Sequence, residues 1–239
     1  MADLSCEIYD QMAVMKTRAS RAVRRAARKR PSLAPANMCA STDLSRSRVE
    51  RLRPKGEFWT DDELLAIGAA DDLKHELWNG KIITMPPAGA RHGDVIMRLA
   101  TAMAHHVYEH KLGRVYDGQT GFRLSTDYCF APDISFVSKE RLKIILPVED
   151  KLFHGAPDLV VEVLSPSDSI TATEKKMTHY LVYGARLGWM VDPKNKTIRA
   201  YREPAKFELL RSERTLTGNA VLPGFRYALS KLFEAAAIN

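Results

Sequence analysis

Two acidic residues of this chain lie in strongly apolar segments. Glu162 interrupts the run Leu-Val-Val-Glu-Val-Leu at residues 159–164, and Asp133 directly precedes the run Ile-Ser-Phe-Val at residues 134–137. Runs of this kind are typical of buried strands, where an unpaired carboxylate is costly and normally finds a partner, a proton or a metal ion. Two acids on two short, buried, neighbouring strands therefore suggest a divalent-metal site.

A lysine and a third acid could join this pair. Lys176 lies in a helix predicted over residues 172–183, where it shares one face with Tyr180, and Glu76 lies in a strand of a predicted hairpin. Two or three carboxylates and one lysine suit the hydrolysis of a phosphodiester, because Mg²⁺ prefers oxygen ligands and keeps several waters. The ion, Mg²⁺ or alternatively Mn²⁺, would activate a water, and the lysine would orient that water or stabilise the charge on the phosphate.

Local patterns predict the elements that must position these residues. Thr60-Asp-Asp-Glu63 is a capping box that begins a short helix, which we expect Gly68 to end. Asn79-Gly80, between two apolar runs, predicts a β-hairpin over residues 75–84. Apolar residues at helical spacing predict the longest helix over residues 91–112. With the strands and the second amphipathic helix that follow, this order indicates an α/β domain around a mixed sheet.

The positive charge of the chain belongs to its N-terminal part. Residues 1–55 hold 13 Lys and Arg against 5 Asp and Glu, a balance of +8, whereas residues 56–239 hold 23 against 24, a balance of −1. We expect residues 1–55 to form a weakly ordered basic arm and residues 56–239 to form the folded domain. The arm could grip nucleic acid, act as a transit peptide or an oligomer arm, or be a variable extension with Met38 as an internal start. Acidic residues near its beginning, Asp3, Glu7 and Asp10, argue against a transit peptide.

Composition also indicates a compartment. The three cysteines, Cys6, Cys39 and Cys129, are an odd number without metal-binding spacing, which favours a reducing cytoplasm over a disulfide framework. No apolar run approaches the roughly 20 residues that a transmembrane helix needs, so we expect no membrane span.

Several short motifs, in order along the chain, resemble one protein family. From Thr60 to Leu232 the sequence is similar to the Uma-two family of restriction endonucleases, a branch of the PD-(D/E)XK nuclease superfamily. The most specific segment is Gly155-Ala-Pro-Asp-Leu-Val-Val-Glu-Val-Leu-Ser-Pro-Ser167. The others are His75-Glu-Leu-Trp-Asn-Gly80, Met85-Pro-Pro, Arg91-His92, Ala131-Pro-Asp133, Lys176 with Tyr180, Gly188-Trp-Met-Val-Asp-Pro193 and Leu222-Pro-Gly-Phe225.

This resemblance implies a restriction-endonuclease-like core, a DNA substrate and a site on the residues already singled out. Asp133 and Glu162 would be the metal ligands, Glu76 a further acid, and His92 a site residue at the start of the long helix. The superfamily's lysine normally follows the acid by two residues, where this chain has Leu164, so its role passes to Lys176. The family also commonly has an acid before the following helix, where this chain has Thr171-Ala172-Thr173.

Structural alternatives remain for each residue. Asp133 could cap a turn, Glu162 could form an ion pair in the core, and Glu76 could be a cross-strand charge of the hairpin. Lys176 could lie on a solvated helix face, and His92 could be structural. The acids, the lysine and the family resemblance together predict a metal-dependent DNA endonuclease. The protein could form a homodimer. The alternative is a catalytically inactive nucleic-acid-binding or regulatory module on the same fold.

Overall fold

The computed structural model describes residues 50–51, 57–71, 73–147 and 150–234. The predicted arm, residues 1–55, lies outside this part of the chain except for strand β1 (Glu50–Arg51), which pairs antiparallel with β3 (Lys81–Met85). Within the described residues, no helix combines the length and the apolar character needed to cross a membrane.

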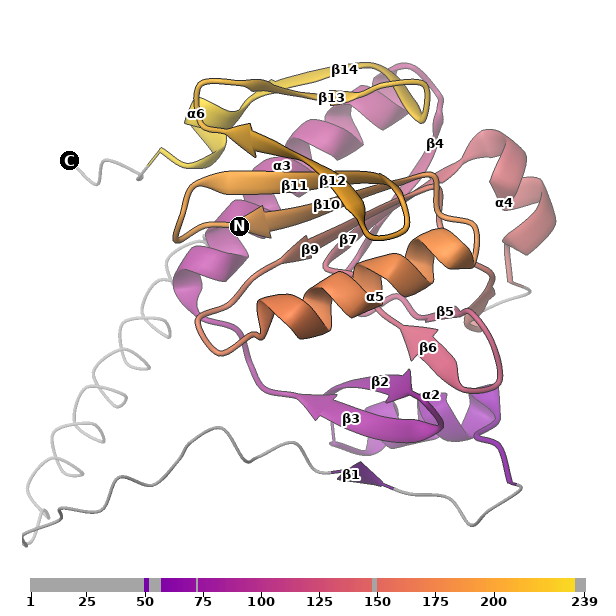
Figure 1. Ribbon diagram of the computed structural model, residues 1–239. Helices are drawn as coiled ribbons and strands as arrows, with labels where there is room; N and C mark the ends of the chain where they lie inside the picture. The colour runs from indigo at the N-terminus through magenta and orange to yellow at the C-terminus, as the bar shows by residue number, and fades with distance from the viewer. Residues whose placement is uncertain (1–49, 52–56, 72, 148–149, 235–239) are drawn as a thin grey trace, which may run out of the picture. The chain divides into compact units, whose positions relative to one another are not determined.

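A mixed six-stranded sheet forms the centre of the fold (Figure 1). Its central strands β9 and β10 run parallel, and every other neighbouring pair is antiparallel. Strands β9 and β10 are buried along almost their whole length, as expected for strands covered on both faces. The order is β12 (Lys206–Arg211), β11 (Thr197–Glu203), β10 (Leu187–Asp192), β9 (Leu159–Val163), β7 (Ile134–Ser138) and β4 (Gly113–Asp117).

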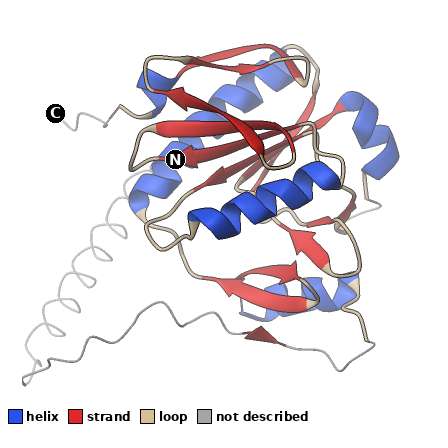
Figure 2. Cartoon of the chain, in the orientation of Figure 1, coloured by secondary structure: helices blue, strands red, loops and turns tan. Residues whose placement is uncertain are grey.

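Helices α3 (Ala90–Glu109) and α5 (Ile170–Val182) cover opposite faces of this sheet (Figure 2). Four residues of α3 at helical spacing, Val95, Leu99, Met103 and Val107, pack against alternate residues of the strands. Met177 and Tyr180 of α5 pack against the other face. Each large side chain buried in this way contributes about 1.5–3 kcal/mol. The predicted long helix and the predicted mixed α/β class are confirmed.

A second sheet carries the hairpin, with the order β1-β3-β2-β6-β5-β8. Its strands besides β1 and β3 are β2 (Lys74–Trp78), β6 (Tyr128–Phe130), β5 (Phe122–Arg123) and β8 (Phe153–His154). The predicted turn is confirmed, because Asn79 and Gly80 have φ of 50° and 73°, the left-handed conformation that a two-residue hairpin requires.

Helix α2 (Asp61–Asp71) packs on the hairpin sheet and begins at the predicted capping box. The Thr60 N–H donates to Glu63 at 2.9 Å, and the Glu63 N–H donates to the Thr60 hydroxyl at 3.3 Å. The expectation that Gly68 ends this helix is wrong, since α2 continues beyond it. Gly68 has no positive φ, and Ala69 and Ala70, which favour helix, follow it.

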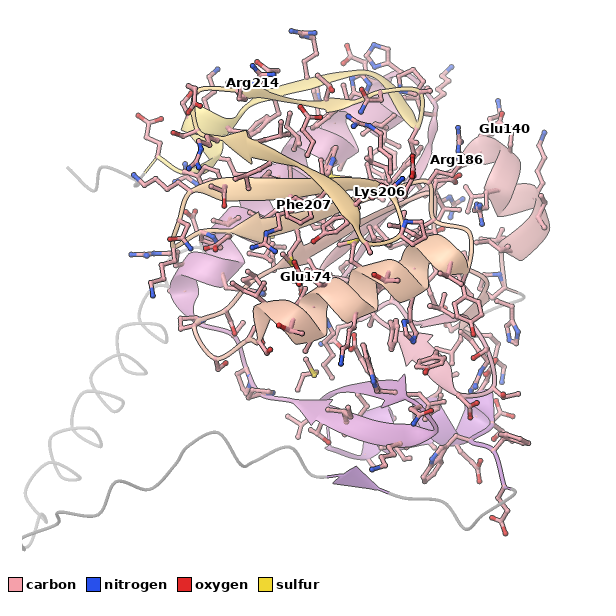
Figure 3. The ribbon with its side chains drawn as sticks, viewed as in Figure 1. Glu140, Glu174, Arg186, Lys206, Phe207 and Arg214 are labelled. Atoms are coloured by element: carbon pink, nitrogen blue, oxygen red, sulfur yellow. The ribbon has the colours of Figure 1, made fainter. Side chains whose placement is uncertain are left out.

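The remaining elements are α4 (Lys139–Ile145), the β13 (Thr215–Gly218) and β14 (Leu222–Ala228) pair, and α6 (Leu229–Leu232). The β13–β14 pair and α6 add buried residues to the core beneath α3. Glu174 of α5 pairs with Arg199 of β11, whose guanidinium carbon lies 4.8 Å from the centroid of the Phe207 ring; Figure 3 labels Glu174 and Phe207. This partly exposed ion pair joins α5 to the sheet.

Candidate active site

The alternation of β9 directs Glu162 toward α5. Leu159, Val161 and Val163 belong to the core beneath α3, so the residues between them face the other side of the sheet. Strand β7 pairs antiparallel with β9, with Ile134 opposite Val161. Extending this register by one residue places Asp133 opposite Glu162. The two acids are therefore cross-strand neighbours, as the sequence predicts.

Helix α5 brings Lys176 onto the same side. The Lys176 ammonium lies 2.8 Å from Glu162 Oε1, and the Tyr180 hydroxyl donates to the same oxygen at 3.0 Å. Lys176 and Tyr180 lie one helical turn apart, so both reach Glu162 from one face of the helix. Lys176 is 7% exposed, whereas the neighbouring Lys175 is exposed. The alternative of a solvated lysine is therefore wrong.

Glu76 meets the same lysine from the hairpin sheet. Its Oε1 accepts a hydrogen bond from the Lys176 ammonium at 2.6 Å and another from the Ala131 N–H at 3.0 Å. Glu76 and Lys176 are 100 residues apart in the chain, and both are buried. The structure thus brings Glu76, Glu162 and Lys176 into one ionic cluster.

Asp133 lies beside this cluster in a polar shell of its own. Its Oδ2 accepts the Val163 N–H at 2.8 Å and lies 3.3 Å from Nε2 of His92, in the first turn of α3. Its Oδ1 lies 3.5 Å from the ammonium of Lys74. His92 therefore contacts Asp133 rather than Lys176, and its side chain helps to fix the orientation of the Asp133 carboxylate.

Burial and neighbouring charges shift the pKa values of this cluster. The pKa of Glu162 is raised to about 7, mainly by burial; the Lys176 charge opposes this rise, and the nearby Asp133 and Glu76 add to it. Burial also acts against ionised Asp133, but the His92 hydrogen bond and the Lys74 charge outweigh it and lower the pKa of Asp133 to about 2. For Lys176, burial is outweighed by Glu162 and Glu76, so its pKa is raised and it stays charged.

The carboxylate oxygens fit a divalent cation that keeps much of its water. Both contacts of Glu162 use Oε1, and its Oε2 has no partner among the described residues. Asp133, opposite Glu162 in the register, supplies a second carboxylate. Among the described residues, no group of three or more His, Cys, Asp or Glu side chains forms a preassembled metal site. Two carboxylates with waters are the kind of ligand set that Mg²⁺ accepts.

Two features of the site escaped the sequence analysis. Lys74 lies two residues before Glu76 on β2, so the alternation of a strand could have placed both on one face. The other feature is the pair of backbone N–H groups, of Ala131 and Val163, that donate to Glu76 and Asp133. Every residue type except proline has such a group, so these hydrogen bonds could be recognised only from the three-dimensional structure.

The chain resembles known proteins both in sequence and in fold. It matches the model of the Uma2 family, described as "Putative restriction endonuclease", over residues 61–230. It is also similar to a solved structure from Anabaena variabilis, described as "a putative nuclease belonging to DUF820", with a TM-score of 0.63 and 24% identity. That similarity covers 73% of this chain and 97% of the other, and no curated protein matches. The shared fold confirms the predicted restriction-endonuclease-like core, a mixed sheet flanked by helices. Because the matched segment spans most of the 239 residues, the chain belongs to the Uma2 family.

Proposed function

We propose that this protein is a metal-dependent endonuclease of the PD-(D/E)XK superfamily that hydrolyses phosphodiester bonds of DNA. The observation that carries the proposal is the buried contact of Lys176 with Glu162, on the strand position opposite Asp133. Acids and a lysine gathered in this way match the chemistry of phosphodiester hydrolysis. Membership of the Uma2 family supports the same reaction class.

Each residue has a distinct role in this proposal. Asp133 and Glu162 would hold Mg²⁺, or alternatively Mn²⁺, and the bound ion would supply an activated water and neutralise phosphate charge. Lys176 stabilises the negative charge that develops on the phosphate, because its raised pKa keeps the ammonium charged at neutral pH. His92 and the Val163 N–H orient Asp133.

The alternative is a catalytically inactive DNA-binding or regulatory module. The balance of −1 over residues 56–239 favours it, since dedicated DNA-binding domains usually carry a basic face. We also propose a cytoplasmic location, because the cysteine pattern suits a reducing compartment. A homodimer is part of the proposal as well.

A cleavage assay separates the two functions. Supercoiled and linear DNA are incubated with the full chain in Mg²⁺, in Mn²⁺ and in EDTA, beside Glu162→Gln and the matched control Lys175→Ala. The nuclease proposal expects cleavage that needs the cation, is lost in Glu162→Gln and persists in Lys175→Ala. DNA binding without cleavage by the wild-type protein in either metal would favour the inactive module.

A further inference from the structure

Lys176 is a single cation shared by two carboxylates from different sheets. Its ammonium lies 2.6 Å from Glu76 of β2 and 2.8 Å from Glu162 of β9. The side chains of all three residues are 9% exposed or less. When both acids are ionised, two negative charges face one positive charge in a site with little solvent. An added cation would offset the excess negative charge, and it would compete directly with Lys176 for Glu162.

Glu76 is held in place independently of this lysine. Its Oε1 accepts the Ala131 N–H at 3.0 Å, and Ala131 lies two residues before Asp133. The carboxylate is therefore anchored to the backbone of the segment that carries the opposite acid. Glu76 would keep its position if Lys176 or Glu162 moved, because that anchor involves neither of them.

We infer that Glu76 is a positioning residue that keeps Lys176 in the site when Glu162 coordinates the cation. This inference rests on the proposed function. A dication at Glu162 would repel the ammonium, and Glu76 would then be the remaining carboxylate within ion-pair distance of Lys176 among the described residues. Without Glu76, the buried ammonium would lose its last carboxylate partner and leave the site for solvent.

The arrangement also argues against Glu76 as a third metal ligand. Glu162 lies on β9, and Asp133 directly precedes the adjacent strand β7 of the same sheet, whereas Glu76 belongs to the other sheet. The Lys176 ammonium contacts both Glu76 and Glu162 and so joins Glu76 to the site. Glu76 therefore acts through Lys176 rather than on the cation.

Chemical labelling of lysines tests this role without relying on activity. The full chain and its Glu76→Gln and Glu76→Asp variants are acetylated with and without saturating Mn²⁺. Mass spectrometry then compares Lys176 with the exposed Lys175 on the same helix. We expect Lys176 to stay protected in the wild-type protein in both conditions. In Glu76→Gln, Mn²⁺ should raise its labelling rate by about tenfold or more, and Glu76→Asp should partly restore protection.

Mn²⁺ affinity and cleavage rate separate the remaining outcomes. A positioning role expects the kcat of Glu76→Gln to fall about 10–100-fold. Weaker Mn²⁺ binding by Glu76→Gln with Lys176 still protected at saturating Mn²⁺ would make Glu76 a ligand, and faster labelling of Lys176 without Mn²⁺ would make the role of Glu76 merely structural; either result overturns the inference. If the variants fail to fold, the wild-type protein still tests the inference. Faster acetylation of Lys176 in wild type on addition of Mn²⁺ would contradict the inference, and unchanged protection would support it. No Mn²⁺ binding by wild type would overturn the proposed function and the inference with it.

Discussion

The substitution Glu162→Gln should stabilise the metal-free protein above neutral pH. Glutamine keeps an oxygen that can accept the Tyr180 hydrogen bond but removes one of the two buried negative charges around Lys176. Lys176 retains Glu76 as its partner at 2.6 Å. The variant therefore contains a balanced ion pair in place of a cluster with excess negative charge.

The size of this effect follows from the shifted pKa of Glu162. A rise from 4.5 to about 7 corresponds to about 3 kcal/mol, since one pKa unit is worth about 1.4 kcal/mol. Folding raises the pKa of Glu162, so this residue does not destabilise the wild-type protein below its unfolded pKa of 4.5. Its ionisation then lowers the free energy of unfolding as the pH rises from 4.5 toward 7. Relative to wild type, Glu162→Gln should gain nothing at pH 4 and up to about 3 kcal/mol at pH 8.

Urea denaturation in EDTA at several pH values between 4 and 8 measures this difference directly. Glu208→Gln is a suitable control, because Glu208 is exposed and pairs with Arg202 at 3.3 Å, so its loss should change stability by less than about 0.5 kcal/mol. If Glu162→Gln proved less stable than wild type at pH 8 by more than about 1 kcal/mol, Glu162 would belong to a net favourable structural ion pair. The reasoning above would then be refuted.

Two further substitutions and one metal titration test other parts of the account. Lys176→Met leaves two buried carboxylates without a cation and should cost about 3–5 kcal/mol in urea melts at pH 8, less at pH 5, whereas Lys175→Ala should cost less than about 0.5 kcal/mol. Asp61→Asn removes a carboxylate that pairs with Arg123 and, at 2.6 Å, with His154; its pKa is lowered, because these partners outweigh its burial. The variant should lose about 1–2 kcal/mol at pH 7, and the difference should vanish as the pH falls below the lowered pKa; a loss that persists at low pH would contradict this. Calorimetric Mn²⁺ titrations should show affinity rising from pH 6 to pH 8 with proton release, because Glu162 must ionise to bind; a flat profile would contradict the raised pKa.

Much of the fold could be predicted from local patterns because local physics determined it. Asn79-Gly80 demands a tight turn whatever surrounds it, and the capping box at Thr60 satisfies its own backbone groups. The prediction at Gly68 failed because a glycine ends a helix only where the chain needs a left-handed residue, and the alanines after it continue α2.

The candidate site was partly visible for the same reason. Glu162 and Asp133 attract attention because a carboxylate in an apolar strand needs an explanation, and the register of β7 and β9 brings them opposite each other. The contact of Lys176 with Glu76 joins two sheets across 100 residues, and no local pattern encodes that distance. Lys74, which reaches Asp133, lies just before the hairpin predicted over residues 75–84, and no local pattern marks it.

The most direct test is a crystal structure of the full chain with Mn²⁺, using anomalous scattering to locate the ion. We predict one anomalous peak between Asp133 and Glu162, about 2.1 Å from a carboxylate oxygen of each, with Lys176 still paired with Glu76. An ion bound elsewhere, or a fully soaked crystal in which Lys176 still occupies Glu162 and no peak lies at these carboxylates, would contradict a metal-dependent active site.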